Sequence, residues 1–89
     1  MFVVYVLYSV RDRHFYVGQT AHLRQRVAFH NAGLVRSTKN RRPLKLLCFE
    51  VYLTRKEAIH RERYLKTNNA RKELRLRLQY SLKLIGDVA

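Results

Sequence analysis

The stretch FVVYVLYSVRDRHFYVG, residues 2–18, decides the fold of this chain. Residues 2–9 are almost all β-branched or aromatic, which predicts a buried strand. A polar turn over residues 10–14 follows, and the next few residues predict a second, short strand. Because only five residues connect the two strands, we expect an antiparallel hairpin that brings Tyr5 near Tyr16.

The middle of the chain predicts a helix, a basic loop and a third strand. Thr20 is in position to N-cap a helix over residues 21–32, and Gly33 is the expected left-handed stop. Residues 34–43 are polar and basic and predict a loop. Residues 44–52 alternate in a pattern that predicts the third strand.

The last third of the chain predicts two further helices. The capping box Thr54-Arg-Lys-Glu57 marks the start of a helix that runs to about residue 66 or 67. Leucines in residues 70–85 fit both the strand period and a helical stripe, and we favour a helix because Lys, Arg, Glu and Leu are good helix formers. Asn68 and Asn69 are the expected junction between the two helices.

These elements predict one α/β domain over residues 1–89. Eighty-nine residues are too few for two ordinary domains. The order ββαβαα predicts a small three-stranded antiparallel or mixed sheet that is flanked by about three helices.

Charge points to the class of partner. Lys and Arg number 19 against 6 Asp and Glu, a formal net charge of +13. Such self-repulsion destabilises a compact domain, so a polyanion, most simply nucleic acid, is the expected partner. The basic residues are spread over several segments and not along one amphipathic helix, which argues against a membrane partner. The chain has no long apolar run and no signal-peptide pattern, which indicates a cytoplasmic protein.

One carboxylate occupies an unusual place in the pattern. On a helical wheel Glu62 falls on the apolar face with Ala58 and Leu65. A carboxylate there must be neutralised, paired or bound to a cation. The residues alone leave two interpretations open, a buried ion pair with an arginine and a metal ligand.

Taken together, the polar and aromatic residues resemble a known family. Val4-Tyr5-Val6 followed by Tyr16-Val17-Gly18 is similar to the paired signature of the GIY-YIG nucleases. Arg26 lies ten residues after the second tyrosine, His30 lies four residues further, and Glu62 lies on a later helix, all at the spacing of that family.

The resemblance extends from Phe2 to about Lys72. The phrases HNAG, STKNRRPLKL and AIHRERYLK look like the small stand-alone, UPF0213-like branch of the superfamily. The chain departs from the common pattern where Gln19 replaces the Lys of some repair nucleases. It also departs where Leu74 stands twelve residues after the Glu, because many members carry Asn in a late helix.

The resemblance implies a divalent-metal-dependent endonuclease that hydrolyses phosphodiester bonds, with nicking of single-stranded or branched DNA as the expected reaction. It implies Mg²⁺ or Mn²⁺ with Glu62 as the protein ligand, and hard oxygen ligands suit either ion. Arg26 would stabilise the phosphate, and Tyr5, Tyr16 or His30 would activate the water. An unperturbed tyrosine is a weak base at neutral pH, so we expect nearby cations to lower its pKa.

Basic residues around this constellation are expected to contact the phosphate backbone. They are Arg36, Lys39, Arg41, Arg42, Lys66, Arg71 and Lys72. The alternative function is a non-catalytic nucleic-acid-binding module that keeps the fold and the charge. The sequence leaves DNA against RNA, the strandedness of the substrate and the oligomeric state undecided.

Overall fold

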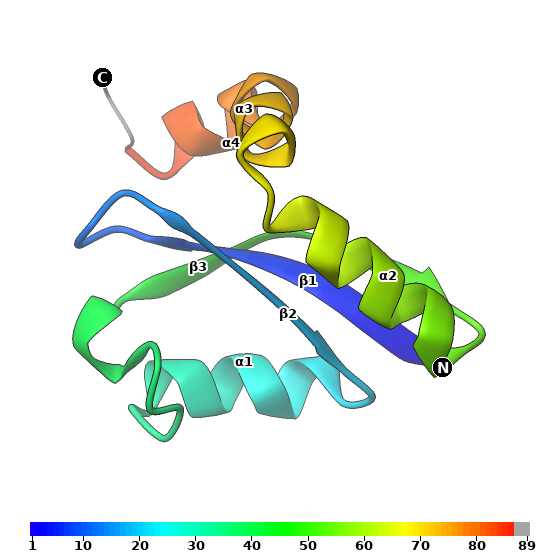
Figure 1. Ribbon diagram of the computed structural model, residues 1–89. Helices are drawn as coiled ribbons and strands as arrows, with labels where there is room; N and C mark the ends of the chain where they lie inside the picture. The colour runs from blue at the N-terminus through cyan, green and yellow to red at the C-terminus, as the bar shows by residue number, and fades with distance from the viewer. Residues whose placement is uncertain (87–89) are drawn as a thin grey trace.

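The hairpin predicted from residues 2–18 forms two adjacent strands of a three-stranded sheet (Figure 1). The structure is a computed structural model that describes residues 1–86. β1 (Phe2–Ser9) is the central strand, with β2 (Phe15–Thr20) on one side and β3 (Leu44–Tyr52) on the other. Both pairings are antiparallel, so the antiparallel form of the predicted sheet is confirmed.

Helices cover both faces of this sheet (Figure 1). α1 (Leu23–Asn31) and a short 3₁₀ turn (Lys39–Arg41) precede β3. α2 (Arg55–Leu65), α3 (Asn68–Arg77) and α4 (Gln79–Leu84) follow it, which confirms the α/β class with the order ββαβααα. Among the described residues, none of the helices has the length and apolar character of a bilayer span.

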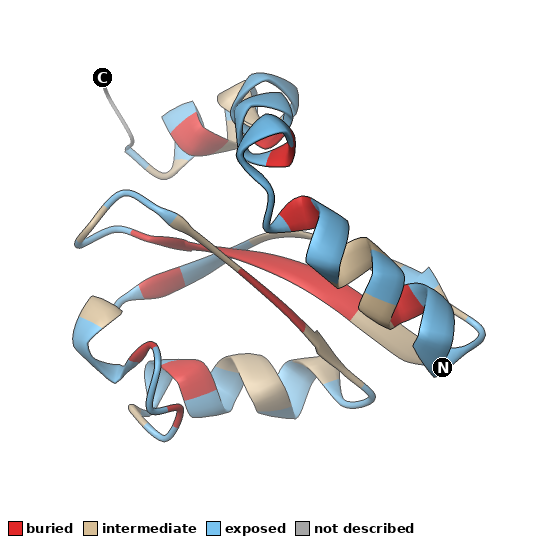
Figure 2. Cartoon of the chain, viewed as in Figure 1, coloured by how far each residue is buried: buried red, intermediate tan, exposed pale blue. Residues whose placement is uncertain are grey.

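β1 is buried along most of its length because successive side chains pack on opposite faces of the sheet (Figure 2). Val4 and Val6 join one core with residues from β2, α2 and α3. The buried members of this core are Val4, Val6, Val17, Ala58, Leu65, Ala70 and Leu74. Tyr5 and Leu7 point the other way and pack with Leu44 and the α1 side chains.

The predicted start of α1 is wrong by two residues. His22 holds the N-cap position and makes no side-chain capping bond. Thr20 Oγ1 instead accepts a hydrogen bond from the His22 backbone N–H at 3.0 Å, a local turn that competes with helix capping. Gly33 ends the helical region with φ +78, in the left-handed conformation expected there.

The later helices follow the sequence pattern more closely. Thr54 caps α2 as predicted, because its Oγ1 accepts a hydrogen bond from the Glu57 N–H at 3.3 Å. Thr67, and not Asn68 or Asn69, caps α3. The single helix predicted for residues 70–85 is divided at Leu78, where φ is −104 and ψ is 17.

The division between α3 and α4 follows from burial of α4 against the rest of the domain. Leu82 of α4 is 4% exposed, and Leu78 packs against the core from the junction. Leu76, on the outward side of α3, is already exposed. A straight continuation of α3 would only extend this exposed helix. The turn at Leu78 therefore buries Leu82 at the cost of helix continuity.

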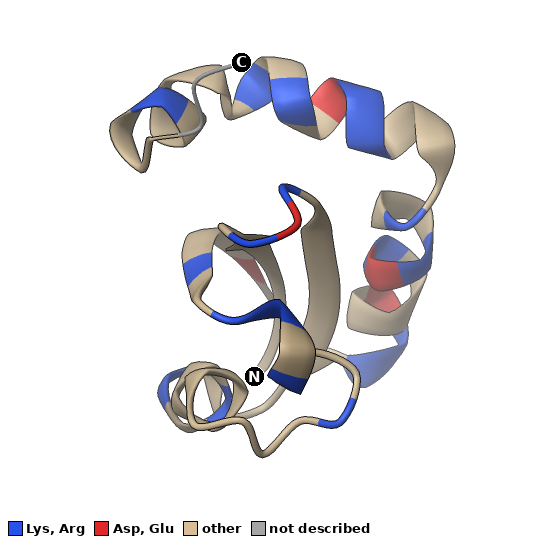
Figure 3. Ribbon diagram, turned by 90° about the vertical axis from the view of Figure 1, so that its left-hand side faces the viewer, with Lys and Arg blue, Asp and Glu red and all other residues tan. Residues whose placement is uncertain are grey.

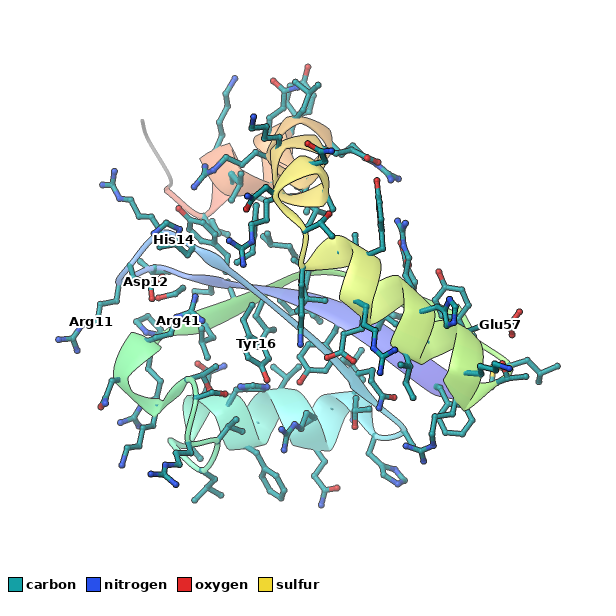
Figure 4. All side chains as sticks on the ribbon, viewed as in Figure 1. Arg11, Asp12, His14, Tyr16, Arg41 and Glu57 are labelled. Atoms are coloured by element: carbon teal, nitrogen blue, oxygen red, sulfur yellow. The ribbon has the colours of Figure 1, made fainter. Side chains whose placement is uncertain are left out.

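The turn between β1 and β2 is tied to the loop before β3 (Figure 4). Arg41 donates from Nε to Asp12 Oδ2 at 2.5 Å and from Nη2 to the carbonyl oxygens of His14 and Phe15 at 3.2 and 3.3 Å. The Ser9 hydroxyl donates to the Arg41 carbonyl at 2.6 Å. Burial is the largest single influence and raises the pKa of the Asp12 carboxyl, but the hydrogen bonds from Arg41 and the His14 backbone, together with the charge of Arg41, hold that pKa below its usual range.

Replacing Arg41 with alanine tests this tie. The change removes the Arg41 donor from two carbonyl groups and from the Asp12 carboxylate, which keeps its bond from the His14 N–H. Partial exposure of the Asp12–Arg41 pair limits the loss to about 1 kcal/mol. A thermal melt is expected to shift down by about 4–8 °C. Arg42→Ala is the matched control because Arg42 makes a single hydrogen bond, to the neighbouring Lys39 carbonyl. Equal shifts for the two variants would contradict a structural role specific to Arg41.

Candidate active site

Tyr5 and Gly18 lie opposite each other in the β1–β2 register. A Cβ atom added to Gly18 would lie 2.5 Å from the Tyr5 hydroxyl oxygen and 2.6 Å from Cζ. Any residue larger than glycine would therefore displace the phenol ring. The glycine of the Tyr16-Val17-Gly18 motif thus leaves room for the Tyr5 ring to lie against the backbone of β2.

Three aromatic rings, those of Tyr5, Tyr16 and His30, meet between the sheet and α1 and form what we call the tyrosine cluster. The ring centroids of Tyr5 and Tyr16 are 6.4 Å apart, which confirms that the hairpin brings the two tyrosines together. His30 of α1 stands edge-on to both, at 5.7 Å from Tyr5 and 4.9 Å from Tyr16. Tyr5 is 1% exposed and His30 is fully buried, whereas Tyr16 is only partly buried. Tyr16 is therefore the member of the trio that solvent reaches.

A chain of hydrogen bonds runs through His30. The Tyr5 hydroxyl lies 2.9 Å from His30 Nε2, and the Thr38 hydroxyl lies 2.7 Å from His30 Nδ1. Thr38 is fully buried, and its hydroxyl has the Val35 carbonyl as a further acceptor at 3.5 Å. Sequence reasoning missed Thr38, because a threonine in a polar loop carries no signal of its contact with a helix residue.

Arg26 lies one turn before His30 on α1 and interacts with both tyrosines. Its pKa is raised above the usual arginine value, first by a hydrogen bond with Tyr5 and also by Tyr16. Burial raises the pKa of Tyr5, and the hydrogen bond from Arg26 lowers it by less. The expectation that nearby cations lower the tyrosine pKa is therefore wrong for Tyr5, which is a neutral phenol at pH 7.

His30 carries no charge at neutral pH. Burial is the larger cause, and the nearby positive charge of Arg26 adds to it, so that the pKa of His30 falls to about 4. A neutral imidazole has one protonated and one unprotonated nitrogen. The ring can therefore accept a proton from Tyr5 when Nδ1 donates to Thr38.

Glu62 lies on α2, which covers the face of the sheet opposite to α1 (Figure 1). Its side chain is 20% exposed and accepts a hydrogen bond from Lys66 Nζ at 2.8 Å. The alternative of a buried ion pair with an arginine is wrong, since this partner is an exposed lysine one turn away. Glu62 is also among the charges that raise the Tyr5 pKa, so the carboxylate lies within electrostatic range of that hydroxyl.

The donor set around Glu62 suits a hydrated hard cation. Within residues 1–86, no group of three or more His, Cys, Asp or Glu side chains gathers as a metal cage. A partly exposed carboxylate whose partner is an exposed lysine is accessible to Mg²⁺, which usually keeps several waters and takes one or two protein carboxylates. The residues present fit such an ion and not a transition-metal centre with nitrogen and sulfur ligands.

The basic residues expected to contact nucleic acid fall into two groups (Figure 3). Arg36 and Lys39 are exposed in the segment after α1, where Arg41 and Arg42 are held by hydrogen bonds to the protein itself. Lys66, Arg71 and Lys72 lie at the α2–α3 junction and along α3. The two groups meet at Arg41, which lines one hollow together with Arg71 and Lys72.

Comparison with known proteins gives a consistent result over most of the chain. Residues 1–75 match the family model described as the GIY-YIG catalytic domain. A UPF0213 protein of Staphylococcus haemolyticus is 35% identical over 74 residues, which cover 82% of this chain and 89% of the relative. One of Clostridium perfringens is 36% identical over 81 residues, or 90% of this chain and 86% of the relative. No solved structure gives a significant match.

The depressed pKa of His30 predicts a pH dependence of stability. The ring has a pKa of about 4 in the folded chain and 6.5 as its ordinary value, so the unfolded chain binds more protons between these pH values. The contribution of His30 to the free energy of unfolding is therefore fully present above pH 6.5. It falls by about 3 kcal/mol as the pH decreases to 4.

His30→Gln removes this titration, and urea unfolding at pH 7 and pH 4 measures the effect. The wild type is expected to lose about 3 kcal/mol more than the variant, and titrating carboxylates such as Asp12 cancel in the comparison. Equal losses in the two proteins would show that His30 titrates normally.

Proposed function

This chain belongs to the GIY-YIG nuclease family, and from that membership we propose that it is a divalent-metal-dependent endonuclease that nicks single-stranded or branched DNA. The observation that carries the proposal is the meeting of Tyr5, Tyr16 and Arg26 with His30, with the charge of Glu62 acting on Tyr5 from α2. Tyr5, Tyr16 and the two α1 residues come from three elements and meet at the edge strand β2, where a nucleic-acid strand has access.

Water activation is assigned to the tyrosines, with His30 behind them. Tyr16 is the tyrosine that solvent reaches, so it orients the attacking water. The water passes its proton to the Tyr5 hydroxyl oxygen while the Tyr5 proton moves to His30 Nε2, 2.9 Å away. Tyr5 therefore never needs to exist as a free phenolate, which its raised pKa disfavours.

Arg26 acts on the phosphate. A guanidinium next to Tyr16 can donate to a non-bridging oxygen, whose negative charge grows as the water oxygen bonds to phosphorus. The bond from phosphorus to the 3′ oxygen then breaks. Since Arg26 is fixed by its contacts with both tyrosines, it is oriented before the substrate arrives.

Glu62 would hold the metal ion. A bound Mg²⁺ or Mn²⁺ supplies charge stabilisation for the pentavalent phosphate and for the leaving oxygen. Lys66 must release the Glu62 carboxylate for this, which is a small change because the pair is surface-exposed on the lysine side.

A non-catalytic binding module remains the alternative function, and it predicts binding without cleavage. The buried Tyr5–His30–Thr38 chain argues against it, because a surface that only binds phosphate has no need of a neutral proton acceptor inside the protein. Backbone binding by cations alone would be sufficient for that function.

Glu62→Gln tests the metal ligand. The amide keeps the shape but loses the charge, so metal-dependent nicking is expected to fall at least 100-fold, with the melting temperature and oligonucleotide binding almost unchanged. The assay is cleavage of labelled oligonucleotides in Mg²⁺ and Mn²⁺. Glu73→Gln is the matched control because Glu73 is also partnered by a basic residue four positions on, Arg77. Full activity in the folded Glu62 variant would remove Glu62 from the mechanism.

Arg26→Ala tests the division between chemistry and binding. Loss of a donor that acts in the transition state lowers kcat by about 10²–10³-fold, with little effect on the affinity for substrate. Arg36→Ala, in the exposed loop, is expected to do the reverse and weaken binding without slowing single-turnover cleavage. If both variants lose affinity alike and cleave alike once saturated, Arg26 is an ordinary phosphate contact.

A further inference from the structure

A basic hollow of about 490 Å³ lies between the β1–β2 turn and α3. In Figure 3 the β1–β2 turn faces α3. Five cations and one carboxylate line this hollow: Arg13, Arg41, Arg71, Lys72, Arg75 and Asp12. None of them belongs to the tyrosine cluster.

The two walls of the basic hollow are joined at one end. Arg75 Nη2 donates to the Arg13 carbonyl at 2.8 Å, and the Arg75 guanidinium lies 5.6 Å from the centroid of the Phe15 ring. Arg13 itself has φ 62, a left-handed conformation that non-glycine residues rarely adopt. The turn is thus held against α3, and the hollow has a defined shape.

Most of the positive charge in the basic hollow is not neutralised by the protein. Asp12 is occupied, because its carboxylate accepts hydrogen bonds from Arg41 and from the His14 N–H at 2.9 Å. Within residues 1–86, the side chains of Arg13, Arg71 and Lys72 make no ion pair. Cations that are brought together without acids create a strong local potential for an anion.

The basic hollow is continuous with the candidate active site. A smaller hollow of about 200 Å³ is lined by Tyr16, Lys66 and Leu65 among others, and it shares Phe15, Arg41 and Arg71 with the larger one. A nucleic-acid strand bound at Tyr16 can therefore extend to Lys72 along one recessed surface.

We propose that the basic hollow is a phosphate-binding subsite for one single strand of nucleic acid, next to the bond that is cut. The inference rests on the proposed nuclease function and names the substrate that its site accepts. A volume of about 490 Å³ is that of a small-ligand pocket, which has room for a nucleotide or two. The subsite recognises phosphates, which DNA and RNA share.

Binding of a fluorescein-labelled dT12 strand in EDTA tests the subsite without cleavage. The Arg71→Ala/Lys72→Ala double variant is expected to reduce the salt slope of log K by about 1.4, since each phosphate contact on a single strand contributes about 0.7. The affinity at 0.1 M salt then falls by about 25-fold. Arg55→Ala/Lys56→Ala is the matched control, because it removes the same two residue types from the far end of α2.

Equal losses in the two double variants would overturn the subsite and leave a general effect of net charge. A matched 12-base-pair duplex that binds more tightly than dT12 and loses affinity in the α3 variant would overturn the preference for a single strand. A parallel titration with rU12 shows whether the protein binds RNA or DNA more tightly. If Arg71→Ala/Lys72→Ala weakens the binding of dT12 and rU12 to a similar extent, recognition through phosphates is supported.

Cleavage in Mg²⁺ and Mn²⁺ separates this proposal from the proposed function. Selective loss of dT12 binding in proteins that never cleave would sustain the subsite and contradict the nuclease. Wild-type cleavage with an α3 variant that binds and cuts normally would contradict the subsite and leave the nuclease intact.

Discussion

The hydrogen bond between Tyr5 and His30 is the interaction on which the candidate site depends. It joins the central strand to α1 in a position without solvent, so neither partner can be changed without leaving a buried polar group unpaired. Gly18 is required beside it because the Tyr5 ring lies against the backbone of β2 there. Burial, in turn, keeps His30 neutral and Tyr5 protonated at pH 7, which are the states that a proton relay requires.

The second constraint is the position of β2 at the edge of the sheet. Side chains of α1 and α2 can approach each other only around such an edge, because elsewhere the sheet separates them. Tyr16 on β2 is therefore partly open to solvent beside Arg26, and α2 carries Glu62 on the other face of the sheet. The same edge leads to the basic hollow, where the Asp12–Arg41 pair fixes the turn and leaves Arg71 and Lys72 for an external anion.

The β1–β2 hairpin, the fold class and the capping box of α2 could be predicted from sequence because they depend on local patterns and one short turn. The proximity of Tyr5 and Tyr16 followed from the length of the hairpin. Thr38 and the true role of Arg41 could not be predicted, since both depend on contacts between distant segments. Glu62 lies on the predicted helix. Its ion-pair partner, Lys66, could not be predicted from composition because the chain has 19 basic residues.

The protonation state of the His30 ring tests the central claim most directly. A two-dimensional ¹H–¹⁵N spectrum of the imidazole nitrogens, recorded from pH 8 to pH 3.5, gives both the tautomer and the midpoint of titration. We expect one neutral tautomer with the proton on Nδ1, towards Thr38, and a midpoint at about pH 4. Averaging between the two tautomers with a midpoint near pH 6.5 would contradict the account, because His30 would then be an ordinary solvated histidine and not the proton acceptor behind Tyr5.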